Sequence, residues 1–235
     1  MVQRFKNFMR AMLVSKKTTF VIPVRGGSRR IPRKNMLVLD GETLLARKIR
    51  QVLPLGKVVV GSDDDEMLEE ASKHGAIAVR RNKTNEGQDS ANDMIKEFME
   101  LIEPCDIVVW AHCTNPFIST STYEKALGAF NKGLAEGYDS LVSVHEIRNH
   151  YWMQGKPLYD LDACRKRHIC AAYLMPLYEQ DGGIFVQSYG QMKKNSYFFG
   201  QKPKLFVIPD EEFCDINTPE DWVACQAIYA YRKGK

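Results

Sequence analysis

Short apolar segments alternate along this chain with amphipathic segments of helical length, and this alternation limits the possible folds more than any other feature. Segments that we expect to form strands occupy 19–24, 57–60, 76–80, 106–110, 140–144, 183–187 and 204–208. Helices are expected at about 44–52, 65–74, 89–101 and 121–132, and a last helix begins after Thr218, which precedes a proline. The strands lack a regular alternation of polar and apolar residues, which is typical of strands buried on both faces. The pattern therefore predicts an α/β fold with a mostly parallel sheet that helices cover on both sides.

The pattern breaks down between about 145 and 178, where aromatic residues, charges and prolines are dense. We interpret this stretch as an insertion rather than as a further layer of the core. The 235 residues suit one α/β domain with such an insertion and are too few for two full-sized domains. The predicted organisation is a basic amino-terminal extension over 1–17, followed by one domain over 18–235.

Composition excludes several classes of protein. The 33 Lys and Arg residues against 29 Asp and Glu give a net charge of +4, which favours small anionic ligands. The basic residues gather in one loop and no nucleic-acid motif accompanies them, so we expect no nucleic-acid partner. No apolar run approaches the ~20 residues that a membrane span needs. The 6 cysteines are scattered without a CxxC pair, which indicates reduced thiols in a cytoplasmic protein.

The loop after the first expected strand carries the strongest chemical signal. It reads RGGSRRIPRKN over 25–35. Gly26 and Gly27 let the backbone approach a ligand closely and turn N–H groups toward an anion, and Arg25 and Lys34 can form charge-assisted hydrogen bonds to phosphate. An open α/β sheet binds its ligands at the carboxyl ends of its strands, which is where this loop would lie. The segment therefore indicates a phosphate-binding loop, with a solvated basic turn as the alternative.

A second informative segment, FCDINTPEDW, occupies 213–222. Asp215 and Asn217 stand two positions apart, so in an extended segment their oxygens would point to one side and could share a magnesium ion with phosphate oxygens. The alternative is that these residues only decorate the start of the last helix. Both interpretations remain open for Asp215.

The segment VIPVRGGSRRIPRKN resembles the opening motif of the acylneuraminate cytidylyltransferases (CMP-sialic acid synthetases), which is roughly IPARxGSKGIPxKN. Further stretches agree in order, namely VVVGSDDDEMLEEASKHGA, QDSAN, CTNPF, DGGIF and FCDINTPEDW. The resemblance covers about 18–230. It implies a Rossmann-like nucleotidyltransferase fold and a homodimer. It also implies transfer of CMP from CTP to a nonulosonic (sialic-acid-like) sugar acid, with Mg²⁺ as cofactor and release of pyrophosphate.

The resemblance also implies roles for individual residues. The catalytic residues would be Arg25, Lys34 and Asp215. The nucleotide-binding residues would be Arg25, Gly26, Gly27, Ser28, Lys34, Asn35, Arg80, Arg81, Ser90 and Asn92. The substrate-binding residues would be His112, Thr114, Asn115, Phe198 and Phe199. Asp215 and Asn217 would hold the metal, and the insertion at about 145–178 would serve dimerisation.

Three departures from the family pattern concern the acceptor and metal positions. His112 stands where many members carry a sugar-contacting glutamine, Ile118 replaces an arginine, and Asn217 replaces the second acid of the terminal motif. The acceptor need not be N-acetylneuraminate itself. Two alternatives follow: a related nucleotidyltransferase acting on a Kdo-like acid, a phosphonate or a sugar phosphate, and a nucleotide-binding protein without turnover. His112 is also a candidate proton acceptor, although a histidine that only fills the sugar pocket explains it as well.

Overall fold

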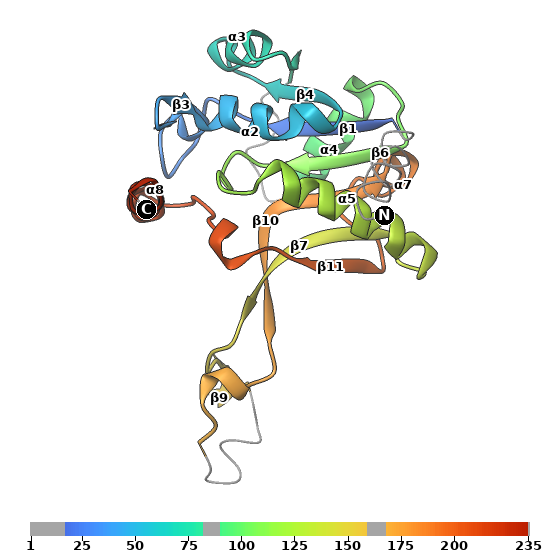
Figure 1. Cartoon of the computed structure of the whole chain (residues 1–235). Coiled ribbons are helices and arrows are strands. Elements are labelled where there is room, and N and C mark those ends of the chain that lie inside the picture. Colours follow the sequence, from blue (N-terminus) through green and yellow to red (C-terminus); the bar gives the residue numbers. More distant parts are fainter. Residues whose placement is uncertain (1–16, 82–89, 159–167, 235) are drawn as a thin grey trace, which may run out of the picture.

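Seven strands form the central sheet, in the order β11-β7-β10-β6-β1-β4-β5 (Figure 1). The structure is a computed structural model that describes residues 17–81, 90–158 and 168–234. The strands are β1 (Thr18–Pro23), β4 (Lys57–Ser62), β5 (Ile77–Arg80), β6 (Ile107–Ala111), β7 (Ser140–Ile147), β10 (Leu177–Ser188) and β11 (Pro203–Val207). Of these strands only β10 runs antiparallel to its neighbours β6 and β7, so the described sheet is mostly parallel. The predicted fold class is confirmed.

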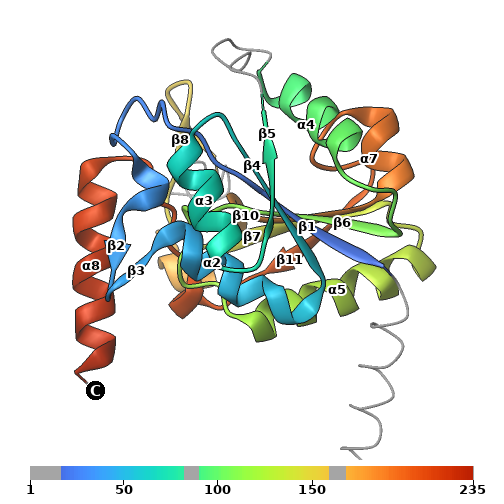
Figure 2. The same cartoon turned by 90° about the horizontal axis from the view of Figure 1, so that it is seen from above.

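Helices cover both faces of this sheet because alternate strand residues point to opposite sides. The helices are α2 (Leu44–Val52), α3 (Asp65–Lys73), α4 (Ser90–Leu101), α5 (Thr120–Ala135), α7 (Tyr189–Asn195) and α8 (Pro219–Lys233). On β1, Phe20 and Ile22 join an apolar cluster with residues of α2, α3 and α5. Val21 between them joins a second cluster with residues of α4 and α7. Figure 2 shows α4 and α7 side by side on that second face.

Helix α8 stands at one side of the molecule, beside the short hairpin of β2 (Val38–Leu39) and β3 (Glu42–Thr43) (Figure 2). The hairpin turns at Asp40 and Gly41, whose φ angles are 58° and 77°. Asp40 accepts hydrogen bonds from Tyr229 and Lys233 of α8, at 2.6 and 2.5 Å. The last helix begins after Thr218 as expected, and a capping box is present there, because Thr218 and Asp221 each bond the other's backbone N–H. Hydrogen bonds therefore stabilise the start of α8, and others join its last turns to the hairpin.

A slender arm leaves the sheet where β7 and β10 continue past it as a two-stranded ladder (Figure 1). Its outer part contains a small hairpin of β8 (Trp152–Met153) and β9 (Lys156–Pro157). The short helical turns in the described ranges are η1 (Lys34–Met36), η2 (Leu53–Leu55), η3 (Ala171–Tyr173) and η4 (Asp210–Glu212). The arm occupies the stretch that the sequence marks as an insertion.

Two elements differ from the sequence-based expectation. Strand β10 begins at Leu177 rather than 183, because the end of the arm pairs with β7 before the chain enters the core. Helix α7 was not expected, since its seven residues hold one buried apolar side chain, Met192, and give no helical repeat. The predicted extension over 1–17 lies outside the described residues except for Lys17. Among the described residues, no helix has the length and apolar character that crossing a bilayer requires.

Candidate active site

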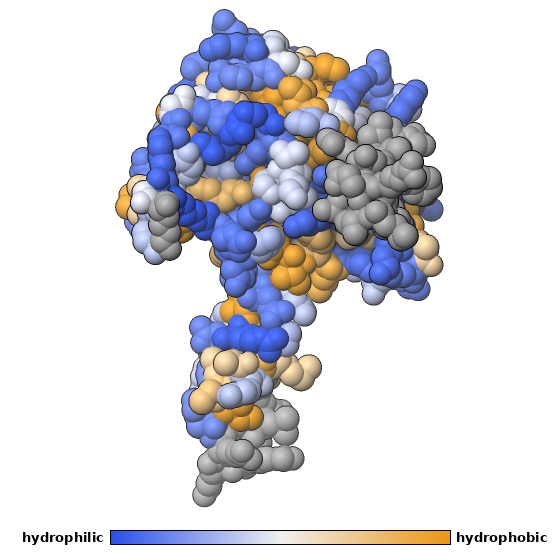
Figure 3. Space-filling view, viewed as in Figure 1, coloured by the Kyte–Doolittle hydropathy of each residue, from blue (hydrophilic) through white to orange (hydrophobic). Residues whose placement is uncertain are grey.

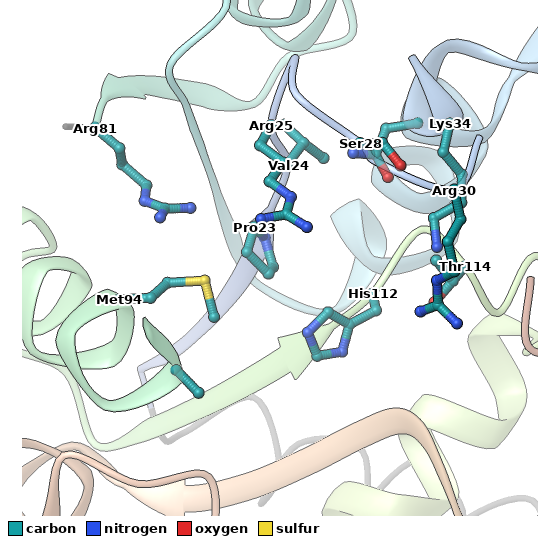
Figure 4. A pocket seen from close by; sticks show the side chains of 12 residues that line it. Pro23, Val24, Arg25, Ser28, Arg30, Lys34, Arg81, Met94, His112 and Thr114 are labelled. Atoms are coloured by element: carbon teal, nitrogen blue, oxygen red, sulfur yellow. The ribbon is translucent and has the colours of Figure 1, made fainter. Parts of the chain in front are cut away.

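A cavity of about 300 Å³ opens at the carboxyl ends of β1, β5 and β6 (Figure 4). The end of β1 and the loop after it contribute the side chains of Pro23, Val24, Arg25, Ser28, Arg30, Lys34 and Asn35. The opposite wall comes from Arg81 after β5 and from Ala91 and Met94 of α4, and the floor from His112 and Thr114 after β6. Four of these lining residues are arginine or lysine. The arrangement suits a polyanionic ligand at the edge where an open α/β sheet binds its ligands.

Two of the cations differ in how they are held. The exposed Arg25 extends from the loop into the cavity, as Figure 4 shows. Lys34 is half-buried and its Nζ donates to the Ile216 carbonyl at 2.6 Å. Burial lowers the pKa of Lys34, and the nearby Asp215 charge opposes this change. The loop thus offers one exposed cation and one half-buried cation to the same space.

Gly26 and Gly27 do not have equivalent surroundings. The Gly26 N–H donates to Asp63 Oδ1 at 2.9 Å, and a Cβ at this position would lie 2.7 Å from Asp64 Oδ2. Gly26 therefore allows the loop to approach the turn at Asp63–Asp64 closely. No atom lies within 4 Å of a Cβ built on Gly27. Anion binding by the two glycines stays a prediction, and Gly26 already has a protein partner for its N–H.

The expected nucleotide-binding residues after β5 divide into two groups. Arg81 is buried, forms an ion pair with Glu97 at 3.3 Å and lines the cavity. Its neighbour Arg80 instead pairs with Asp65 and donates to the Asp63 carbonyl, away from the lining. Asn92 is exposed on the first turn of α4 and is not part of the lining. The side chain of Ser90 lies outside the described part of the chain.

The expected acceptor residues also separate. His112 and Thr114 line the cavity, whereas Asn115 is buried beneath it and donates to the Asp181 carbonyl at 2.8 Å. Phe198 and Phe199 are partly buried in the core cluster, and Phe198 stacks on Phe185 at 4.7 Å between ring centroids. The Phe198 ring also lies 6.0 Å from the His112 ring. Phe198 thus packs beside the histidine, and neither phenylalanine is part of the cavity lining.

The loop before α8 brings Asp215 and Asn217 next to the basic loop. Asn217 Nδ2 donates to Asp215 Oδ2 at 2.5 Å, and Asn217 Oδ1 accepts from Arg30 at 3.0 Å. The Ile216 N–H between them donates to the Thr114 carbonyl at 3.0 Å, which ties this loop to the cavity floor. Asn217 therefore links Arg30 to Asp215, and one of the two lone pairs of its amide oxygen already accepts from a protein donor. No group of three His, Cys, Asp or Glu residues suited to a metal occurs in the described ranges.

Sequence reasoning missed several lining residues, namely Pro23, Val24, Arg30, Ala91 and Met94. Arg30 belongs to the same basic cluster as Arg25 and carried the same signal. Ala91 and Met94 stand three positions apart, a spacing that places both on one face of α4. This face of α4 could have been assigned to the site, because residues at the start of the helix were already expected to contact a nucleotide.

Comparisons with known proteins agree with this geometry. A family model described as Cytidylyltransferase matches residues 19–154. A pseudaminic acid cytidylyltransferase of Campylobacter jejuni is 28% identical over 91% of this chain and 96% of its own length. A CMP-N,N'-diacetyllegionaminic acid synthase of Legionella pneumophila is 26% identical over 88% and 94%.

Solved structures share the fold. A CMP:2-keto-3-deoxy-manno-octonic acid synthetase complexed with CTP has a TM-score of 0.66 at 18% identity and covers 92% of this chain and 99% of its own. A 4-diphosphocytidyl-2C-methyl-D-erythritol synthase of Anaerococcus prevotii has a TM-score of 0.65 at 14% identity, with coverage of 92% and 97%. The family model spans more than half of the chain and includes the basic loop, Arg81 and the cavity floor. The chain belongs to the cytidylyltransferase family.

Proposed function

We propose that the protein transfers CMP from CTP to a nonulosonic acid and releases pyrophosphate. The observation that carries the proposal is the cavity of Arg25, Arg30, Lys34 and Arg81 in a chain of this family. Its four cations suit a triphosphate, and its relatives along nearly the whole chain are named for pseudaminic and diacetyllegionaminic acids. The proposed domain covers 18–235 and works in the cytoplasm.

The chemistry is in-line attack of an acceptor hydroxyl on the α-phosphorus of CTP. Such a reaction needs positioning and charge stabilisation more than covalent catalysis. Arg25 can stabilise the charge that shifts toward the leaving pyrophosphate, because its side chain lines the cavity. Lys34 offers a fixed positive charge, because the Ile216 carbonyl holds its Nζ. His112 and Thr114 then face the acceptor from the floor of the cavity.

Magnesium is part of the proposal, and the residues present fit a site with one carboxylate. Asp215 lies close enough for its charge to act on Lys34 and His112, both of which line the cavity. Mg²⁺ commonly binds through one or two carboxylates and completes its shell with water and substrate phosphates. Asp215 would hold the ion, and Asn217 Oδ1 could join it through the lone pair that the bond from Arg30 leaves open. When bound, the ion supplies neutralisation of phosphate charge and lowers the pKa of a coordinated hydroxyl.

The proposed assembly is a homodimer joined through the arm. Trp152, Tyr173 and Met175 of the arm are 70, 83 and 77% exposed. Figure 3 shows apolar side chains on the surface of the arm, far from the sheet. Large exposed aromatic and methionine side chains are enriched at protein interfaces. Within the described part of the arm these side chains stay exposed, so a second copy of the chain can cover them.

Pyrophosphate release tests the proposed function. The protein is incubated with each of the four nucleoside triphosphates and Mg²⁺, and with a panel of sialic, pseudaminic, legionaminic and Kdo acids. We expect release with CTP and at least one nonulosonic acid, and formation of the CMP-sugar. Binding of CTP without release with any acceptor would contradict the proposal.

A further inference from the structure

Lys48, in the middle of α2, is fully buried and takes no part in the chemistry described above. Its Nζ donates to the Asn115 carbonyl at 2.9 Å and to the Tyr123 hydroxyl at 3.0 Å. Lysine is rarely buried in this way unless its amino group has partners. Burial lowers the pKa of Lys48 to about 7. A neutral amine still has two N–H groups, one for each partner, so these bonds survive loss of the charge.

Both partners of Lys48 lead to segments under the cavity. Asn115 ends the short loop that carries His112 and Thr114, and its Nδ2 donates to the Asp181 carbonyl at 2.8 Å. The Tyr123 hydroxyl contacts the Gly183 carbonyl at 3.4 Å. Lys48 therefore joins the loop after β6 to both ends of the turn at 181–183 in β10. These bonds fix the distance between the two segments.

The orientation of the His112 ring depends on the distance between the loop after β6 and the turn at 181–183. Its Nδ1 lies 2.6 Å from the Gly182 carbonyl, in the middle of the same turn. A carbonyl oxygen only accepts, so Nδ1 carries the hydrogen. Burial lowers the pKa of His112, which keeps the ring neutral at pH 7. In a neutral ring with hydrogen on Nδ1, Nε2 has a lone pair and acts as an acceptor.

We propose that Lys48 is a positioning residue that holds His112 with its bare Nε2 available to the acceptor substrate. The inference rests on the proposed function and adds a rule for the acceptor. The acceptor group that meets His112 is a hydrogen-bond donor, a hydroxyl or an amide N–H, and not a carboxylate or carbonyl oxygen. The rings of Trp110, Phe185 and Phe198 surround His112, with centroids 6.0 to 6.3 Å from its own. The nearby Asp215 charge opposes the effect of burial on the pKa of His112.

The variant Lys48→Met keeps an unbranched apolar side chain, one atom shorter than that of lysine, and removes the N–H groups. We expect the KM for the acceptor to rise about tenfold or more, the cost of one or two lost buried hydrogen bonds, with the KM for CTP changed less than twofold. Gln51→Met is the matched control, because Gln51 is also buried on α2 and donates to the Pro116 carbonyl, one residue beyond Asn115. Equal effects of both variants on the acceptor KM would overturn the proposal.

A spectroscopic measurement tests the positioning without any turnover. The ¹⁵N resonances of His112 in the free wild-type protein should show hydrogen on Nδ1 and none on Nε2. In Lys48→Met we expect a mixture of the two tautomers, and in Gln51→Met the wild-type pattern. An unchanged tautomer in Lys48→Met would overturn the proposal even if the enzyme proved to use no nonulosonic acid, so the two proposals fail separately.

Tyr123→Phe keeps the test open if Lys48→Met does not fold, because it removes only the hydroxyl between Lys48 and Gly183. A smaller rise in acceptor KM is expected, and none would count against the network. The rule for the acceptor is tested with His112→Phe and a set of monodeoxy acceptors. One analogue should be used at least about tenfold less well than its parent by the wild type and equally well by His112→Phe. Unchanged discrimination in His112→Phe overturns the rule.

Discussion

Arg25 and Lys34 reach one cavity from one loop, and we expect both to be essential for turnover. Arg25→Ala or Lys34→Ala should lower kcat by at least ~100-fold, because each removes a positive charge that stabilises the transition state. Folding should survive in Arg25→Ala, since the side chain is exposed. Arg29→Ala is the control, because Arg29 is an exposed arginine of the same loop outside the cavity lining. Circular dichroism and pyrophosphate release measure both properties, and normal turnover in both variants would remove the role given to this loop.

Asp215 and Asn217 make the dependence on magnesium testable. Asp215→Ala should abolish activity, because it removes the one carboxylate that we assign to the ion. Asn217→Asp should lower the Mg²⁺ concentration needed for half-maximal rate several-fold, since it adds a negative charge beside Asp215. Acceptor preference should stay the same in Asn217→Asp. Titration of Mg²⁺ at saturating CTP measures this, and wild-type activity of Asp215→Ala throughout would place the metal elsewhere.

Several residues that the sequence assigned to the site also line the cavity, among them Arg25, Lys34 and His112. Arg80 has the right chemistry, but adjacent strand-end residues diverge, and only Arg81 faces the cavity. The role of Lys48 could not be predicted from the sequence, because its hydrogen-bond partner Asn115 lies 67 positions away. A lysine on an amphipathic helix is ordinarily solvated, and nothing local shows that this one is buried.

At the scale of elements, the spacing of apolar residues and the residue types at element ends predicted most of the strands and helices. The buried strands were found from apolar runs, and α8 from Thr218 and Pro219 at its start. Asp40 and Gly41, which turn the hairpin of β2 and β3, are residue types that suit positive φ angles. The extension of β10 into the arm was not predictable, because the pairing of Leu177 with Ile147 depends on a partner on the other side of the insertion.

The arm gives a prediction about assembly. We expect a two-fold homodimer at micromolar concentration, because the exposed Trp152 and Tyr173 have no cover within the described chain. Trp152→Glu or Tyr173→Glu should shift the mass toward a monomer. Val223→Glu is the matched control, since Val223 is also a large apolar residue, 64% exposed, but lies on α8. Light scattering coupled to size exclusion decides, and a monomeric wild type would contradict the prediction.

At the scale of the whole molecule, the position of the cavity follows from the arrangement of strands in the sheet and not from a local sequence pattern. The loops after β1, β5 and β6 come from distant parts of the chain, and parallel strands bring their carboxyl ends to one edge. This much could be predicted from the fold class alone. The network beneath the cavity could not, because it depends on how α2, α5 and β10 pack together around Lys48, and that packing also affects global stability.

The buried amine should make stability depend on pH. The pKa of Lys48 is about 7 in the folded protein, against 10.5 as its usual value, so between these pH values the unfolded chain binds more protons. The cost of burying the charge is fully present below pH 7 and is relieved as pH rises. From pH 7 to 9 the free energy of unfolding should therefore rise by about 2 kcal/mol more in the wild type than in Lys48→Met. Other titrating groups, including the buried Cys113 thiol, are present in both proteins, so the difference isolates Lys48. Urea denaturation at pH 7, 8 and 9, at one protein concentration, measures it. Parallel stability curves for the two proteins would mean that the amine stays charged when buried, with an acidic partner that the two neutral hydrogen bonds do not supply.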